Sequence, residues 1–182
     1  TGVLMDAANA NGIVITGGTN NNGTYTISDT ASALSDSNFT KGANSKAATT
    51  VTAVIATDDQ DITGVTFDSD VTNINLNDKT GVLMDAANAN GIVITGGANN
   101  NGTYSITDTS SALSDGNFTK GNGSKAAASV TVLVAGDDEN IAAIDLDSDV
   151  TAINLNDKTG VILDMANIGS RTISTGANTN GT

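Results

Sequence analysis

The residues of this chain best suited to chemistry are aspartates, which form two short clusters in each of two similar stretches. Several carboxylates on one flexible loop are what a hard cation such as Ca²⁺ requires, and an Asp-x-Asp spacing supplies two of them from one turn. We therefore expect calcium as the candidate ligand, although the sequence requires no cofactor. The candidate calcium ligands are Asp58, Asp59, Asp61, Asp68, Asp70, Asp137, Asp138, Asp145, Asp147 and Asp149. The alternative interpretation is that these acids are solvated turn residues without a ligand, since no EF-hand series with a central Gly and a closing Glu is present.

The same composition argues against an enzyme and against an anionic partner. The chain has no His and no Cys, so the commonest general base and the commonest transition-metal ligands are missing. Paired aspartates could flank a glycosidic bond, but every such pair recurs in the second stretch and no aromatic platform accompanies it. A net charge of -13 repels nucleic acid phosphates and anionic membrane faces. No stretch approaches the roughly 20 apolar residues of a membrane-spanning helix, so we expect no membrane insertion.

A long repeat with a period of 79 organises the chain. Residues 1–18 return unchanged at 80–97, and residues 1–79 differ from residues 80–158 at 21 positions. Apolar differences keep their character, as where Val54 becomes Leu133. The first repeat therefore spans 1–79 and the second 80–158, and the two share one fold. Residues 159–182 form the start of a third repeat, and we expect the sequence to be a fragment of a longer array.

Short apolar runs separated by turn residues predict an all-β protein with little helix. Nearly all acids are Asp, which favours turns and caps over helix interiors. Residues 30–34 and 80–84 are each predicted to form at most one helical turn capped by the preceding Asp. The predicted strands lie at residues 12–16, 24–28, 50–56, 63–67 and 71–76, and the 52–56 part is apolar enough to be buried on both faces.

Two architectures fit this pattern. A β-solenoid stacks its coils at about 4.8 Å and fills its interior with ladders of like residues. With about 26 residues in a coil, one repeat would hold three coils and advance the axis by about 14 Å. The alternative is a string of small immunoglobulin-like β-sandwich modules with antiparallel sheets. The absence of Pro and Trp and the 3% of aromatic residues favour the solenoid, whose core is built from small and β-branched side chains.

One motif resembles a known class of proteins. The segment Tyr25 to Asp36, YTISDTASALSD, and its counterpart Tyr104 to Asp115 are similar to repeats of large secreted bacterial adhesins, haemolysin-type proteins and surface-layer proteins. The calcium nonapeptide Gly-Gly-x-Gly-x-Asp is not matched, since Gly17-Gly18 is followed by Thr-Asn. The resemblance implies an exported, repetitive protein located outside the cell or at its surface.

The sequence thus predicts a structural role. We expect a segment of a secreted surface or filament-forming protein, such as an extracellular fibre, a sheath or a surface layer. The open ends of a solenoid expose unpaired backbone groups, so self-association into filaments or a lattice is expected. The alternative is an adhesin stalk or a calcium-stiffened binding module, for which a cell-surface glycan or another cell is the candidate partner.

Overall fold

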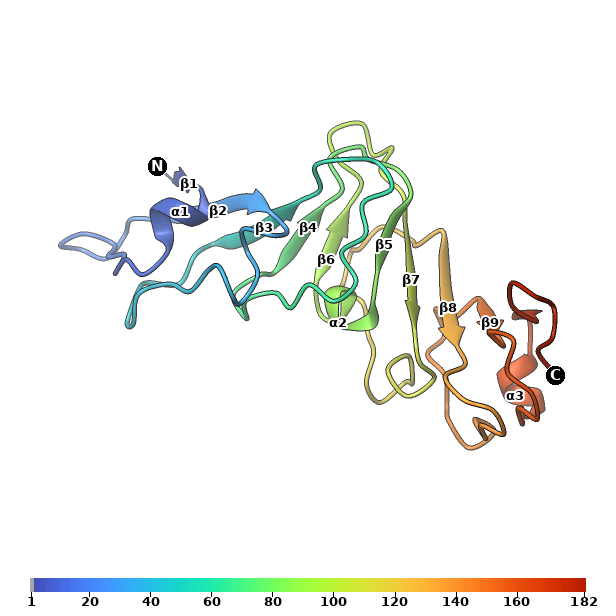
Figure 1. Ribbon diagram of the computed structural model, residues 1–182. Helices are drawn as coiled ribbons and strands as arrows, with labels where there is room; N and C mark the ends of the chain where they lie inside the picture. Colours follow the sequence, from blue (N-terminus) through green and yellow to red (C-terminus); the bar gives the residue numbers. More distant parts are fainter. Residues whose placement is uncertain (1) are drawn as a thin grey trace.

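A computed structural model describes residues 2–182 and shows an elongated β-solenoid of about eight coils (Figure 1). Its strands form two five-stranded sheets, and every pair of neighbouring strands is parallel. The first sheet contains β1 (Val3–Met5), β2 (Tyr25–Thr30), β3 (Thr50–Val54), β4 (Asn73–Asn75) and β6 (Val93–Thr95). The second contains β5 (Val82–Met84), β7 (Tyr104–Asp108), β8 (Ser129–Leu133), β9 (Ala152–Asn154) and β10 (Thr172–Ser174). The predicted all-β solenoid is confirmed, and the antiparallel sandwich alternative is wrong.

The pairing register gives the length of each coil. Val3 pairs with Tyr25 on the next coil, and Ile74 pairs with Ile94. The longest step joins Thr26 of β2 to Thr50 of β3, and the β7 to β8 step has the same length. A coil therefore takes roughly 20–24 residues, so the expected coil of about 26 residues is wrong. The expectation assumed that a repeat holds a whole number of coils, which the next feature of the fold contradicts.

Successive repeats start on successive sides of the coil. The first repeat begins with β1 in the first sheet, and the second begins with β5 in the second sheet. The third begins beside Asn140, which pairs with Ile162 outside both sheets on a third side of the coil. That third side carries short turns and single helical turns, among them residues 64–68 and α2 (Ala86–Ala89). One repeat therefore makes about three and one third coils and advances the axis by about 16 Å, not the roughly 14 Å expected from three coils.

Ladders of inward-facing apolar side chains fill the solenoid. In the first sheet Ala53, Ile74 and Ile94 stack in register, and all three are fully buried. The strands alternate, since β3 buries Val51 and Ala53 while its other residues are half-exposed. Burial of residues 52–56 on both faces was thus a wrong expectation. The reason is that the outer face of each sheet meets no second layer, so polar and small residues occupy it.

Helix is confined to three single turns, at α1 (Ala7–Ala10), α2 (Ala86–Ala89) and α3 (Met165–Ile168), in the part of the chain that the structure describes. The prediction of a helical turn at residues 80–84 is wrong, because Val82–Met84 forms β5 and the turn follows it. The carboxylate of Asp85 caps α2 by accepting the backbone N–H of Asn88 at 2.8 Å. The segment 30–34 forms a hydrogen-bonded turn without a helix. Within residues 2–182, no helix has the length and apolar character needed to cross a membrane.

Two predicted strands depend on their neighbours. Residues 12–16 form no strand in the first repeat, whereas the matching residues of the second repeat form β6 against β4. The first coil has no preceding coil in the structure with which those residues could pair. Residues 63–67 also form no strand: Gly64 has a φ of 76° within a turn, and the matching residues of the second repeat form no strand either. Strand formation is therefore set by stacking as much as by the local sequence.

Candidate functional site

The first aspartate of each acidic cluster joins one repeat to the next. Asp58 accepts hydrogen bonds from the backbone N–H and the hydroxyl of Thr80, at 2.7 and 3.1 Å. Asp137 makes the same two bonds to Thr159, at 2.8 and 3.2 Å. The backbone N–H bonds are the main cause of a lowered pKa for both carboxyl groups. These acids are therefore contacts between stacked coils, and they are held in the ionised form.

A second joining contact comes from an aspartate that sequence reasoning did not single out. Asp78 accepts the backbone N–H groups of Asn99 and Asn101 and the side-chain amide of Asn99, at 3.0 to 3.1 Å. Asp157 binds the matching residues of the third repeat in the same way. These N–H bonds lower the pKa of both carboxyl groups. The signal in the sequence was the pairing of Asn-Asp-Lys with an Asn-rich turn one coil later.

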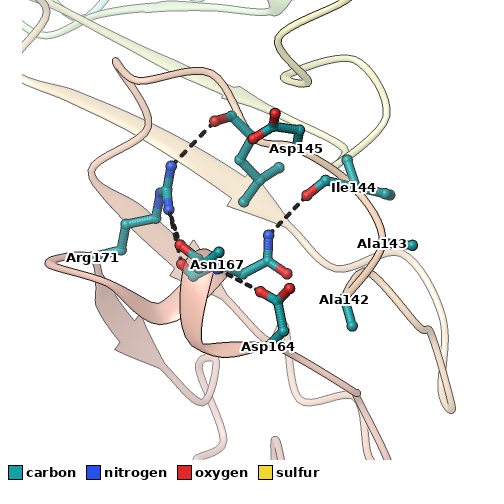
Figure 2. A pocket seen from close by; sticks show the side chains of 9 residues that line it. Ala142, Ala143, Ile144, Asp145, Asp164, Asn167 and Arg171 are labelled. Carbon is teal, nitrogen blue, oxygen red and sulfur yellow. Dashed lines mark hydrogen bonds between the residues drawn. The ribbon is translucent and has the colours of Figure 1, made fainter.

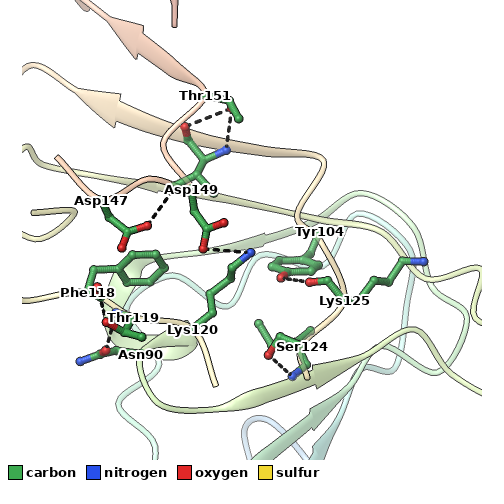
Figure 3. Close-up of polar contacts among 12 residues, drawn as sticks. Asn90, Tyr104, Phe118, Thr119, Lys120, Ser124, Lys125, Asp147, Asp149 and Thr151 are labelled. Atoms are coloured by element: carbon green, nitrogen blue, oxygen red, sulfur yellow. Dashed lines mark hydrogen bonds and ion pairs between the residues drawn. The ribbon is translucent and has the colours of Figure 1, made fainter. Parts of the chain in front are cut away.

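The second acidic cluster contains an ion pair between coils, drawn for the second repeat in Figure 3. Lys120 Nζ lies 3.2 Å from Asp149 Oδ2, and the matching pair of Lys41 and Asp70 is closer, at 2.9 Å. The lysine side chains are largely buried, at 12% and 13% exposure. Beside the pair, Asp147 accepts the backbone N–H of Asp149 at 2.8 Å. The cluster thus fixes a turn and compensates a buried lysine.

Burial has the opposite effect on the inner aspartate of this cluster. Asp68 and Asp147 are 9% and 8% exposed, which places them among the few buried acids of the chain. Desolvation raises the pKa of both carboxyl groups, and the neighbouring acid of the turn adds to the increase. The lysine acts in the other direction without cancelling the effect. Ionisation of these two groups therefore costs the folded protein some stability.

The remaining candidate ligands are separated from these pairs. Asp61 accepts the backbone N–H and the hydroxyl of Thr63, within its own turn. Asp59 is left-handed, with φ of 52°, and its carboxylate lies so close to Gly81 that a Cβ there would come within 2.1 Å of it. Asp138 repeats this arrangement at Gly160. The carboxylate of Asp145 lines a pocket and receives no hydrogen bond from residues 2–182. Across that described part of the chain, no three acidic side chains converge into a group that could hold a metal ion.

A row of hollows follows the third side of the solenoid. One is lined by Ser32 to Asn38 together with residues 64–66, and a second shares Gly64 and Val65 and extends to Asn90. A third shares Asn90 and is lined by residues 108–117 on the next coil. The hollows therefore run along the axis over several coils. Their lining combines Ser, Thr, Asn and Asp with Ala, Val and Gly, so polar groups alternate with apolar surface.

The third repeat differs from the others at an arginine. Arg171 replaces the buried Ile92 of the second repeat, and its guanidinium donates to five backbone carbonyls, some of which are drawn in Figure 2. Two of these carbonyls, of Ala166 and Asn167, lie at the end of α3. The other three belong to the preceding coil, at Leu146, Asp147 and Val150. The planar fork thus ties one coil to the one before it.

Exposed apolar side chains gather in the first and last coils of the described residues. The apolar side chains with the largest exposure in residues 2–182 are Val3, Leu4, Ile13, Val14, Ile162, Met165 and Ile173. All of them lie in the first coil or in the coils nearest residue 182. In the second repeat the same sequence is covered, since Val82 is 0% exposed where Val3 is 53% exposed, and Ile92 is 8% exposed where Ile13 is 51% exposed. The end of the preceding repeat accounts for the difference.

Comparison with known proteins gives no match: no family model, no curated protein and no solved structure is significantly similar to this chain.

Proposed function

We propose that this chain is a structural segment of a secreted, repetitive surface or filament-forming protein. The observation that supports this proposal is the recurrence of one junction between stacked repeats. Residues 58–79 contact the coil that follows them through the same Asp–Thr and Asp–Asn bonds that residues 137–158 make one repeat later. A junction that repeats with the same bonds can add further units without a new kind of contact.

Comparison of covered and uncovered copies of the same residues indicates how a further unit would pack. Val3 and Ile13 are exposed at one end, whereas the same residue types in the second repeat are covered by the preceding coil. A coil of another copy would cover this apolar surface and pair with the free edge of β1. Both ends of one molecule differ, so the contact is head to tail and leads to filaments instead of closed dimers.

The experiment compares the assembly of the 182-residue chain with that of two lysine variants. Negative-stain images and sedimentation are expected to show filaments that lengthen with protein concentration. Ile13→Lys places a charge in the end contact and should give short, single rods. The matched control, Thr52→Lys, places the same charge on the outer face of β3 and should leave filaments intact. Single rods of constant length for the unmodified chain at all concentrations would refute filament formation.

Those single rods are the expected result of the alternative function, an adhesin stalk or binding module that does not polymerise. The row of hollows along the axis favours this alternative, because its mixed polar and apolar lining offers an extended surface to a linear polymer such as a cell-surface glycan. Binding of the rods to immobilised glycans would then separate a stalk from a fibre. We further propose an extracellular location and no nucleic acid partner, from the motif resemblance and the charge of -13.

A further inference from the structure

One substitution between the repeats changes a turn on the coil that precedes each helix. Gly64 has φ of 76°, and in this left-handed conformation its N–H donates to Asp85 Oδ2 at 2.9 Å. The matching residue of the second repeat is Ala143, which does not take a left-handed conformation. A Cβ makes that conformation costly, so the turn rearranges. The N–H of Ala143 consequently does not reach Asp164, which is the counterpart of Asp85.

The helix cap that follows is left with free acceptor atoms. At α2, Asp85 and Asn88 form a reciprocal capping box in which the Asn88 side-chain oxygen accepts the Asp85 N–H. At α3, Asp164 Oδ1 still accepts the N–H of Asn167 at 2.7 Å. The second half of the box is missing, and Oδ1 of Asn167 is buried without a hydrogen-bond partner. A buried amide oxygen without a donor is costly and points to a missing partner.

Asp164 and Asn167 both line a pocket of about 240 Å³, which is shown in Figure 2. Asn167 is only 3% exposed, and its side-chain nitrogen is fixed by a bond to the carbonyl of Ile144 at 2.9 Å. That bond turns the amide oxygen toward the carboxylate of Asp164. Within residues 2–182, Asp164 Oδ2 also receives no hydrogen bond. Asp164 Oδ2 and Asn167 Oδ1 therefore both lack a donor from the described residues.

The charge around the pocket favours a cation. Asp145 and Asp164 both line it, and Arg171 is the single basic group among its lining residues. All five N–H groups of Arg171 are directed to backbone carbonyls, so the guanidinium has no donor left for the pocket oxygens. The two carboxylates exceed its charge by one negative unit. The whole chain adds a negative field, with a net charge of -13.

We propose that this pocket binds one hard cation, of the size and chemistry of Ca²⁺, between Asp164 Oδ2 and Asn167 Oδ1. Carboxylate and amide oxygens are the protein ligands that Ca²⁺ prefers, and water completes its shell in a site with few protein ligands. Asp145 contributes charge at the rim of the pocket. A site with so few protein ligands binds weakly, with a dissociation constant of about 1 mM. The site belongs to the third repeat alone, because Gly64 closes the equivalent position at α2.

The test is a calcium titration of the ¹⁵N-labelled 182-residue chain, followed by NMR at constant ionic strength. The side-chain amide of Asn167 and the backbone N–H of Ala143 are expected to shift along a one-site curve that saturates by about 20 mM Ca²⁺. Ala143→Gly restores the residue of the first repeat and should abolish the curve. Asp164→Asn should also abolish it, while Asn preserves the helix cap.

Asp85→Asn is the matched control, because it changes the equivalent carboxylate at α2 and should leave the calcium curve unaltered. Spectra without calcium establish that each variant keeps the fold, since signals from the first repeat should coincide with those of the unmodified chain. The proposal is overturned by a linear, unsaturated shift in the unmodified chain, which is the result expected if only water fills the pocket. A saturating curve that survives in Ala143→Gly would overturn it as well.

Discussion

Replacement of Arg171 by Ile tests how the coil at the start of the third repeat is held. Ile is the residue at the same position of the second repeat, where it is buried, so the substitution fits the repeat. It removes five donors that bind carbonyls at 2.9 to 3.3 Å. We expect local loosening of α3 and β10 without global unfolding, because the other coils keep their own ladders.

The expected loss of local stability is the free energy of the lost hydrogen bonds minus the free energy gained by burying the Ile side chain. Each hydrogen bond contributes about 0.5–1.5 kcal/mol net, so with the long bonds to Leu146 and Asp147 at the lower limit the five bonds amount to about 2.5–5.5 kcal/mol. Burial of the Ile side chain returns about 1.5–3 kcal/mol. The expected net loss is about 2 kcal/mol, which corresponds to roughly a 30-fold increase in local opening.

Native-state hydrogen exchange measures this opening directly. The N–H of Thr172 donates to Thr151 O at 3.0 Å and joins β10 to the preceding coil. Its exchange should accelerate about 30-fold in Arg171→Ile. The N–H of Val93, which makes the equivalent bond to Thr72 in the second repeat, should exchange at an unchanged rate.

Arg171→Lys separates the fork geometry from the charge. Lys keeps the positive charge but has three donors on one atom, so it cannot reach carbonyls on two coils at once. We expect it to accelerate Thr172 exchange at least about tenfold. Unchanged protection of Thr172 in both variants would refute the assignment of the guanidinium as the tie between coils, and unchanged protection in the Lys variant alone would assign the effect to charge.

Four further predictions concern the buried core, the acidic residues and the axial rise. Ile74→Ala removes a fully buried member of an inward ladder and should cost about 2–5 kcal/mol in urea unfolding, with the same loss for Ile153→Ala in the second repeat. Stability should fall as the pH drops below 3.8, because Asp58, Asp78, Asp137 and Asp157 have lowered folded pKa values and their contribution is lost as they are protonated. The raised pKa of Asp147 has the opposite effect on stability, because ionisation of this carboxyl group costs stability as the pH rises through the folded pKa. The Asp147→Asn variant should therefore melt at a higher temperature than the unmodified chain at neutral pH, and this difference should disappear below pH 3.8. Cryo-electron microscopy of filaments should give an axial rise of about 16 Å per repeat, and a rise of roughly 35–45 Å would contradict a stacked solenoid.

The sequence identified the architecture because each of its signals had a physical cause that acts at short range. Inward positions must be apolar and similar in size to stack, which is why Ile55 of the first repeat and Val134 of the second, both fully buried, exchange like for like. Turn residues with left-handed backbones are mostly Asn, Asp and Gly, as predicted from their short side chains. These local preferences suffice to predict strands, turns and the absence of long helices.

The length of a coil could not be predicted from the sequence, because the signals described above act only at short range. The step from Thr26 to Thr50 is longer than the step from Ile74 to Ile94, and the difference lies in loops outside the ladder. The period of 79 residues defines the repeat, but it does not determine how many coils one repeat makes. Which strand stacks on which is a long-range property, and the third side of the coil has no alternating pattern to reveal it.

The candidate site was predicted only in part. The acidic residues were found, but Asp58 and Asp137 bind Thr residues one coil away and Asp70 and Asp149 pair with lysines of another coil, roles that spacing along the chain cannot show. The departures at Ala143 and Arg171 were visible as differences between copies. They had no interpretation until the structure placed both residues beside the same helix cap.

The advance of each repeat by a third of a coil determines the mechanical character of a long array. Any feature that occurs once per repeat, such as the ion pair of Lys41 and Asp70, reappears about 120° around the axis in the next unit. With a whole number of coils per repeat, these features would align as stripes, and the rod would bend toward one edge. Rotation distributes charge and stiffness evenly, so the rod resists bending equally in every direction and presents the same set of surfaces to neighbours on all sides. Three units, about 48 Å long, are the true translational period of such a fibre.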